Sequence, residues 1–189
     1  MNSSTQSSIL FSLVSILIIG NVAQARVNLG KSLPISDLIT KVCDDELVIE
    51  KAKCVDILTS NPKILAAKSP LQISKLILTL AVNKAGKGQK FLQTLAEKDK
   101  SPAIQQCAGS DYDAVIASFQ SALKGIENDP ITANYDAKIA GDDADNCAKG
   151  LAEAKIVNPA VTKINDEIML LSDIAFGATN LIERKTTPQ

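Results

Sequence analysis

Four polar residues that each precede a proline divide the chain beyond residue 68 into four segments. They are Ser69-Pro70, Ser101-Pro102, Asp129-Pro130 and Asn158-Pro159. A polar side chain can cap the first turn of a helix, and proline is favoured at the first helical position because its missing N–H would have no partner there. Each of these dipeptides therefore predicts the start of a long helix.

Apolar or small residues recur every three or four positions after each start, as they do in helices that bury one face in a bundle. The four stripes are Ile73, Ile77, Ala81, Ala85, Gly88, Leu92 and Leu95; Ile104, Ala108, Tyr112, Val115, Phe119, Ala122 and Ile126; Ala133, Ala137, Ala140, Ala144, Ala148 and Leu151; and Val161, Ile164, Ile168, Leu171, Ala175, Ala178 and Ile182. The connections are short, so consecutive helices are expected to be antiparallel. We predict an all-α, up-down-up-down four-helix bundle over about residues 70–185.

Two glycines, Gly86 and Gly88, fall inside the first of these helices. Each is expected to weaken the helix by roughly 1 kcal/mol relative to alanine. They do not form a phosphate-binding loop, because such a loop follows a strand and none is predicted here. Either they allow a close contact with another helix, or they mark a bend.

Two shorter helices are expected before the bundle. Ser36 is suited to cap a helix that runs through Cys43, and a second helix from about Leu47 to Leu58 carries Cys54. The second helix should end at the break Ser60-Asn61-Pro62. We therefore predict an N-terminal helical hairpin at about residues 35–60.

The first 25 residues carry no charged side chain, and an apolar run extends from Ile9 to Ile19. Ala23-Gln24-Ala25 follows, which is the small-x-small pattern of a cleavage site. We interpret residues 1–25 as a secretory signal peptide and residues 26–189 as one mature domain. The alternative is a membrane anchor, but the run is short for a span and no stop-transfer pattern follows it.

All four cysteines lie in the mature part: Cys43, Cys54, Cys107 and Cys147. An even number of cysteines in a secreted chain predicts two disulfides, and the count alone leaves three pairings open. Zinc binding is the competing interpretation, but the chain has no Cys-x-x-Cys motif and no histidine. We expect no metal and no cofactor.

The absence of histidine also argues against catalysis. It removes Ser-His-Asp and Cys-His nucleophile arrangements, and the Glu-x-x-His pairs of di-iron bundles. The 20 basic and 21 acidic residues give a net charge of -1, so bulk charge attracts neither nucleic acid nor an anionic membrane. We expect a protein that is not an enzyme and binds neither nucleic acid nor, after signal cleavage, a membrane.

A signal peptide, a cysteine-containing hairpin and a four-helix bundle with a cysteine pair 40 positions apart resemble the plant invertase/pectin methylesterase inhibitor family. The resemblance extends from about Ile35 to Ile182, and the alanine-rich, acidic stretch before Cys147 fits it. Cys107 is followed by Tyr112, with a gap one residue longer than is usual in the family. The resemblance implies the disulfides Cys43–Cys54 and Cys107–Cys147.

The resemblance also implies a secreted inhibitor that blocks a carbohydrate-active enzyme of the cell wall, or of the vacuole, in a stoichiometric complex. The expected partner is pectin methylesterase or acid invertase. Some invertase inhibitors carry Pro-Lys-Phe where this chain has Pro130-Ile131-Thr132, which slightly favours pectin methylesterase. The alternatives from other classes are a carrier of an apolar ligand in the bundle core and a signalling bundle.

Helical phase places a mixed polar set on the outward side of the second and third bundle helices. It comprises Asp113, Ser121, Lys124, Tyr135, Lys138, Asp142 and Asp145. We expect this set to contact the partner, with Tyr135 as its anchor, because tyrosine is enriched at binding hot spots. The competing interpretation is an ordinary solvated face.

Three aspartates, Asp142, Asp143 and Asp145, are crowded together in the sequence. Mutual repulsion is expected to raise the pKa of one of them.

Overall fold

The structure is a computed structural model, and it describes residues 36–186, with side chains as far as Ile182. The predicted signal peptide, residues 1–25, lies outside the described residues. Every regular element between residues 36 and 186 is helical. None of these helices has the length and apolar character that crossing a bilayer requires.

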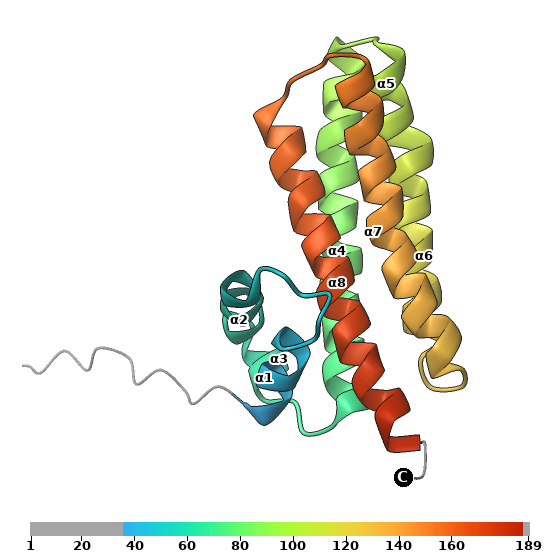
Figure 1. The fold of residues 1–189 in the computed structure, drawn as a ribbon. Helices are drawn as coiled ribbons and strands as arrows, with labels where there is room; N and C mark the ends of the chain where they lie inside the picture. The colour runs from blue at the N-terminus through green and yellow to red at the C-terminus, as the bar shows by residue number, and fades with distance from the viewer. Residues whose placement is uncertain (1–35, 187–189) are drawn as a thin grey trace, which may run out of the picture. The chain divides into compact units, whose positions relative to one another are not determined.

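The hairpin contains three helices, one more than the sequence suggested. They are α1 (Asp37–Cys43), α2 (Lys51–Thr59) and α3 (Pro62–Leu65). The third is a single turn that begins at Pro62, where the sequence indicated only a break, and Asn61 caps it by accepting a hydrogen bond from Lys63 N. Figure 1 shows these helices beside the bundle, with α1 against α8 and α3 against α4.

The bundle is formed by four long helical segments that alternate in direction (Figure 1). They are α4 (Pro70–Lys98); α5, η1 and α6 in succession (Pro102–Gln106, Cys107–Asp111 and Tyr112–Gly125); α7 (Pro130–Glu153); and α8 (Pro159–Thr186). α4 and α7 each pack on both α6 and α8, so they lie diagonally opposite one another. The predicted all-α bundle is confirmed.

Three of the four polar residues that precede a proline cap their helices as expected. Ser69 accepts from Gln72 N at 3.2 Å, Asp129 from Thr132 N at 3.0 Å, and Asn158 from Val161 N at 3.3 Å. Ser101 makes no such bond, although α5 still begins at Pro102. Proline in the first turn therefore sets this start without help from a cap.

The sequence suggested a regular α-helix for the second bundle helix, but the structure shows an irregular segment in it. Its segment η1, Cys107–Asp111, is π-helical, and α-helical geometry resumes at Tyr112. A π-turn accommodates one additional residue without ending the helix. This matches the longer gap between Cys107 and Tyr112, and both sides of the predicted stripe stay buried across it.

The two glycines of α4 have different surroundings, and this decides between the two alternatives. α4 is continuous, so neither glycine ends or interrupts it. A Cβ atom on Gly88 would lie 2.8 Å from Ile164 Cγ2 and 3.0 Å from Tyr112 Cε1, whereas Gly86 has open space beside it. Gly88 therefore permits a close helix contact.

The disulfides are Cys43–Cys54, within the hairpin, and Cys107–Cys147, which joins η1 to α7. This is the pairing that the resemblance implied, and all four cysteines are buried.

The Tyr112 hydroxyl donates to Asn165 Oδ1 at 2.8 Å, and Asn165 Nδ2 donates to Cys147 Sγ at 3.1 Å. Burial, with a smaller contribution from Glu167, raises the pKa of Tyr112 above its usual value, so the phenol stays neutral.

We predict opposite effects for alanine at the two glycines of α4. Gly88→Ala should lower the free energy of unfolding by about 1–3 kcal/mol, because the new methyl group overpacks the contact with Ile164 and Tyr112. Gly86→Ala should raise it by up to about 1 kcal/mol, because alanine favours the helix and meets nothing there. Urea unfolding of both variants measures this, and equal shifts would contradict the close contact.

Candidate partner-binding surface

The structure places the seven predicted partner-binding residues outside the bundle core. Asp145 and Lys138 are half-buried, and the other five are exposed: Asp113, Ser121, Lys124, Tyr135 and Asp142. Helical phase was therefore sufficient to find outward positions. Packing decides which of these positions lie together.

Asp113 and Ser121, both on α6, face different neighbours. Asp113 Oδ1 accepts a hydrogen bond from Gln89 Nε2 of α4 at 2.6 Å. Ser121 Oγ donates to Asp136 Oδ2 of α7, also at 2.6 Å. Asp113 therefore belongs to the side of α6 that faces α4, while Ser121 belongs to the α6–α7 side.

Lys138, Asp142 and Asp145 line one pocket with Asp173 of α8, and each takes part in an ion pair. Lys138 Nζ is 3.4 Å from Asp142 Oδ1 and 3.6 Å from Asp173 Oδ1 of α8. Asp145 Oδ2 is 2.5 Å from Lys149 Nζ. The pairs with Asp142 and with Lys149 are the more exposed ones, and pairs of that kind contribute little to stability.

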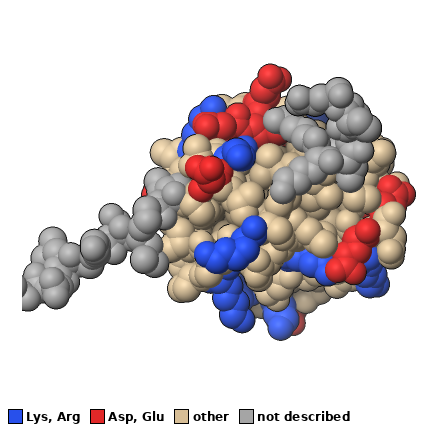
Figure 2. Space-filling model, turned by 90° about the horizontal axis from the view of Figure 1, so that it is seen from below, with Lys and Arg blue, Asp and Glu red and all other residues tan. Residues whose placement is uncertain are grey.

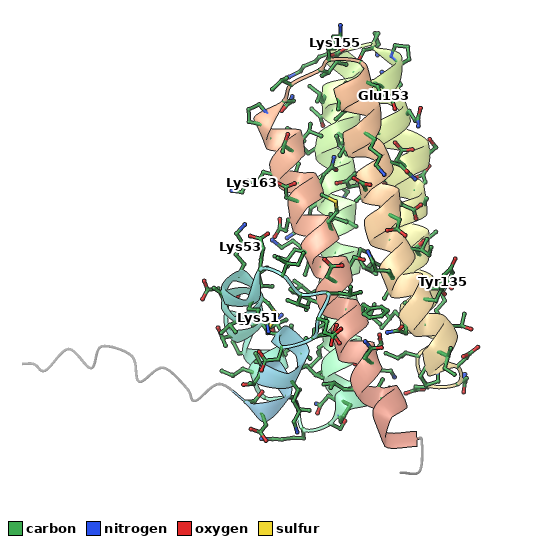
Figure 3. The ribbon with its side chains drawn as sticks, in the orientation of Figure 1. Lys51, Lys53, Tyr135, Glu153, Lys155 and Lys163 are labelled. Atoms are coloured by element: carbon green, nitrogen blue, oxygen red, sulfur yellow. A yellow bond between two sulfur atoms is a disulfide. The ribbon has the colours of Figure 1, made fainter. Side chains whose placement is uncertain are left out.

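A large exposed apolar group occupies the first turns of α7. Tyr135 is 64% exposed and Ile131 is 71% exposed. Residues four apart on a helix share a face, so the two side chains are neighbours, and we call them the α7 anchor pair. Figure 3 shows Tyr135 on α7 near its start, directed away from the bundle.

Sequence reasoning selected Tyr135 but missed Ile131. The signal was present, because Ile131 is a large apolar residue that lies outside the buried stripe of Ala133, Ala137 and Ala140. What sets Ile131 apart from other exposed apolar residues, such as Ile49 and Val157, is that it lies one helical turn from the exposed Tyr135.

The turn before the anchor pair is fixed by its own hydrogen bonds. Asp129 accepts from Thr132 N at 3.0 Å and from Thr132 Oγ1 at 2.6 Å. The hydrogen bonds from Thr132 hold the pKa of Asp129 below its usual value. The anchor pair therefore stands on a capped helix start rather than on an irregular loop.

Two carboxylates of this region have raised pKa values, and burial is the main cause for both. Burial raises the pKa of Asp143, Asp142 and Asp111 add to the increase, and the hydrogen bond from Ser118 opposes it. Burial likewise raises the pKa of Asp173, and Lys138 opposes that increase. The expected rise within the acidic cluster is found at Asp143, but repulsion by Asp142 is a secondary cause.

Charge is distributed unevenly around the bundle. α4 carries five lysines and one glutamate, whereas α7, diagonally opposite, carries five carboxylates and two lysines. Seen from below, lysines and carboxylates lie around the rim of the surface, in places side by side, with uncharged area between the groups (Figure 2). The anchor pair therefore lies on the more acidic of these two helices, in its first turns, whereas four of the five carboxylates lie at residues 142–153.

A groove of about 660 Å³ lies between α2 and the first part of α8. Lys53 and Lys163 line it, on the hairpin side of the molecule (Figure 3), together with Ile57. The ion pair Lys84–Glu167, with 2.6 Å between Nζ and Oε1, also lines it. Such a charged groove is not the dry apolar cavity that a carrier of an apolar ligand requires.

Among the described residues no group of His, Cys, Asp or Glu could hold a metal ion.

Comparison of the sequence with profiles of known families gives a match that covers both the hairpin and most of the bundle. The sequence profile described as "Plant invertase/pectin methylesterase inhibitor" matches residues 37–176. This chain belongs to that family. Its members are inhibitor proteins, so the chain is not itself an enzyme.

Two relatives support the same assignment. Two proteins provisionally named as invertase inhibitors, from Platanus orientalis and Platanus acerifolia, are each 30% identical over 135 residues. That match spans 68% of this chain and 78% and 74% of the two relatives.

The fold matches two crystal structures of pectin methylesterase inhibitors from Arabidopsis. One, a mutant form, gives a TM-score of 0.67 at 21% identity and covers 77% of this chain and 97% of its own. The other gives 0.56 at 20% identity and covers 80% and 96%. At these identities the likeness establishes the fold of the inhibitor bundle and leaves the target enzyme to experiment.

We predict that Asp143→Asn stabilises the protein at neutral pH and has a smaller effect in acid. Because the folded-state pKa of Asp143 is raised, the half-buried charge costs stability above that pKa, and the cost disappears as the pH falls below it. The melting temperature of the variant should exceed that of the wild type at pH 7, and the gap should close toward about pH 4. A gap that widens in acid would contradict this assignment. Asp166→Asn, at an exposed carboxylate of α8, serves as the control.

Proposed function

We propose that the mature chain is a secreted inhibitor that blocks a plant cell-wall carbohydrate-active enzyme by forming an equimolar complex. Family membership supports the inhibitory class, and two buried disulfides are typical of secreted proteins. The charge-free first 25 residues supply the proposed signal peptide. The apoplast is the proposed location, with the vacuole as the alternative.

The single observation that carries the proposed binding surface is the α7 anchor pair. Ile131 and Tyr135 are large, exposed and adjacent, while the rest of α7 buries mainly alanines. Interface hot spots are enriched in aromatic side chains surrounded by groups that exclude water. We therefore place the centre of the interface at the anchor pair. Ser121, Lys124 and Asp136 form its polar rim, with Lys138, Asp142 and Asp145 at the α8 side.

Rigidity is the second requirement, because binding costs less when the surface is already ordered. The Cys107–Cys147 disulfide joins the two helices that present the surface, and the Ser121–Asp136 and Ser118–Asp143 hydrogen bonds join them further along. The capped start of α7 fixes the turn next to Ile131. A much larger enzyme would therefore meet a preformed surface.

Pectin methylesterase is our preferred target, and acid invertase is the alternative. The chain has Ile131-Thr132 where some invertase inhibitors carry lysine and phenylalanine, so the cation of that motif is missing. The Platanus relatives bear provisional invertase-inhibitor names, so both enzymes belong in the test.

The test is a titration of the oxidised mature protein, residues 26–189, against a plant pectin methylesterase and an acid invertase at mildly acidic pH. We expect saturating inhibition of pectin methylesterase at about one inhibitor per enzyme, as a high-affinity equimolar complex requires. Saturating inhibition of invertase alone would reverse our preference. Inhibition of neither enzyme would contradict the proposal.

We predict that truncating the anchor pair weakens inhibition without unfolding the bundle. Tyr135→Ala should raise the inhibition constant by about 30-fold, the effect of losing a hot-spot residue worth about 2 kcal/mol. Ile131→Ala should raise it by a smaller factor. Both side chains are exposed, so the melting temperature should change little.

Phe91→Ala is the matched control, because Phe91 is also an exposed large apolar residue but lies on α4, diagonally opposite α7. It should leave the inhibition constant unchanged. Equal losses in Tyr135→Ala and Phe91→Ala would contradict the proposed location of the surface.

A further inference from the structure

Three polar side chains form a continuous chain of hydrogen bonds from the hairpin through α8 to α7. Asp45 follows α1, Asn180 lies in α8, and Asn134 lies in the second turn of α7. Asn180 Nδ2 donates to Asp45 Oδ2 at 3.1 Å, and Asn134 Nδ2 donates to Asn180 Oδ1 at 3.0 Å. Asp45 and Asn134 are each only 9% exposed.

The hydrogen bonds that link Asn134, Asn180 and Asp45, which we call the relay, all run in one direction. Each amide donates toward the Asp45 carboxylate, which also accepts from Leu47 N at 3.2 Å. Hydrogen bonds that are aligned in this way polarise and strengthen one another in a low-dielectric interior. Asn134 Nδ2 also lies 2.7 Å from Thr179 Oγ1 and 3.0 Å from the Phe176 carbonyl oxygen, so it shares its two hydrogens among three acceptors of α8. A change at Asp45 can therefore affect Asn134.

Gly177 brings the hairpin close enough to α8 for the relay to form. A Cβ atom at this position would lie 2.8 Å from Asp45 Cβ and 3.0 Å from the Val42 carbonyl oxygen. α1 and the turn after it therefore rest directly on the backbone of α8. This contact lies three residues before Asn180, less than one turn away.

We propose that Asn134 and Asn180 are positioning residues that couple the docking of the hairpin to the orientation of the first turns of α7. Asn134 immediately precedes Tyr135, so the bonds that fix Asn134 on α8 also fix the direction in which the anchor pair points. A hairpin displaced from α8 weakens these bonds and loosens the partner-binding surface. The consequence for inhibition rests on the function proposed above, whereas the structural coupling does not.

The alternative is that Asn134 and Asn180 only stabilise the fold. Asn165 provides the matched control, because it is also a buried asparagine of α8 that joins two other parts of the bundle. Asn165 forms hydrogen bonds with Tyr112 and Cys147, which lie in the part of the bundle next to η1 rather than at the start of α7. Asn165→Ala should lower the melting temperature while leaving the start of α7 in place.

A charge exchange between Asp45 and Asn180 tests the coupling directly. Asn180→Asp replaces the donor with a second carboxylate facing Asp45, and Asp45→Asn in the same chain restores a donor and an acceptor with the direction reversed. Two readouts are measured well below the melting temperature of every variant. One is amide hydrogen exchange of residues 36–67 and 130–140, and the other is inhibition of the target enzyme.

Repulsion from Asp45 should turn the new carboxylate away from both neighbours, so we expect Asn180→Asp to accelerate exchange in both segments and to raise the inhibition constant about tenfold, a typical coupling between sites. The double variant should return both readouts to within about threefold of the wild type. Asn165→Ala should leave residues 130–140 and the inhibition constant unchanged.

Faster exchange in the hairpin alone, with residues 130–140 unaffected, would overturn the coupling. So would equal losses in Asn165→Ala and Asn180→Asp. If the wild type inhibits no enzyme, the function proposed above fails, but the exchange measurement still decides whether the hairpin and α7 are coupled.

Discussion

The Cys107–Cys147 disulfide is the constraint on which the rest of the bundle depends. It closes a loop of 40 residues that contains all of α6 and most of α7, and such a crosslink contributes roughly 4 kcal/mol in the chain-entropy model. Tyr112 and Asn165 surround it with donors that are themselves satisfied, so the polar cluster does not destabilise the core. Because the crosslink is buried, α6 and α7 keep their relative position at the end opposite the anchor pair.

Small residues then decide how closely the helices approach. α7 contributes mainly alanines to the core, and at Gly141 the missing side chain makes room for Ser172 Oγ, which donates to the Ala137 carbonyl at 2.8 Å. Gly88 and Gly177 create similar contacts for α4 and for the hairpin. Ile131 and Tyr135 lie outside this core, so the contact with a partner proposed for them would leave its packing unchanged.

The sequence was sufficient for the helices and their buried faces, because those depend on local rules of capping and period. It could not show the η1 segment, because that depends on how one extra residue is absorbed between Cys107 and Tyr112. Nor could it show the bonds of Asn134 or Asp113, whose partners lie on helices distant in sequence. Helical phase identified outward residues, but only packing separated the α4 side of α6 from the side that flanks the anchor pair.

The surface proposed to meet the enzyme comprises the first turns of α7 and the adjacent part of α6. Hydrogen exchange of the inhibitor, free and in complex with its target enzyme, would reveal whether these residues are covered. We predict protection in residues 118–139 and none on the outer face of α4 around residues 87–98. Protection of α4 or of the hairpin, with the α6–α7 region unchanged, would contradict it.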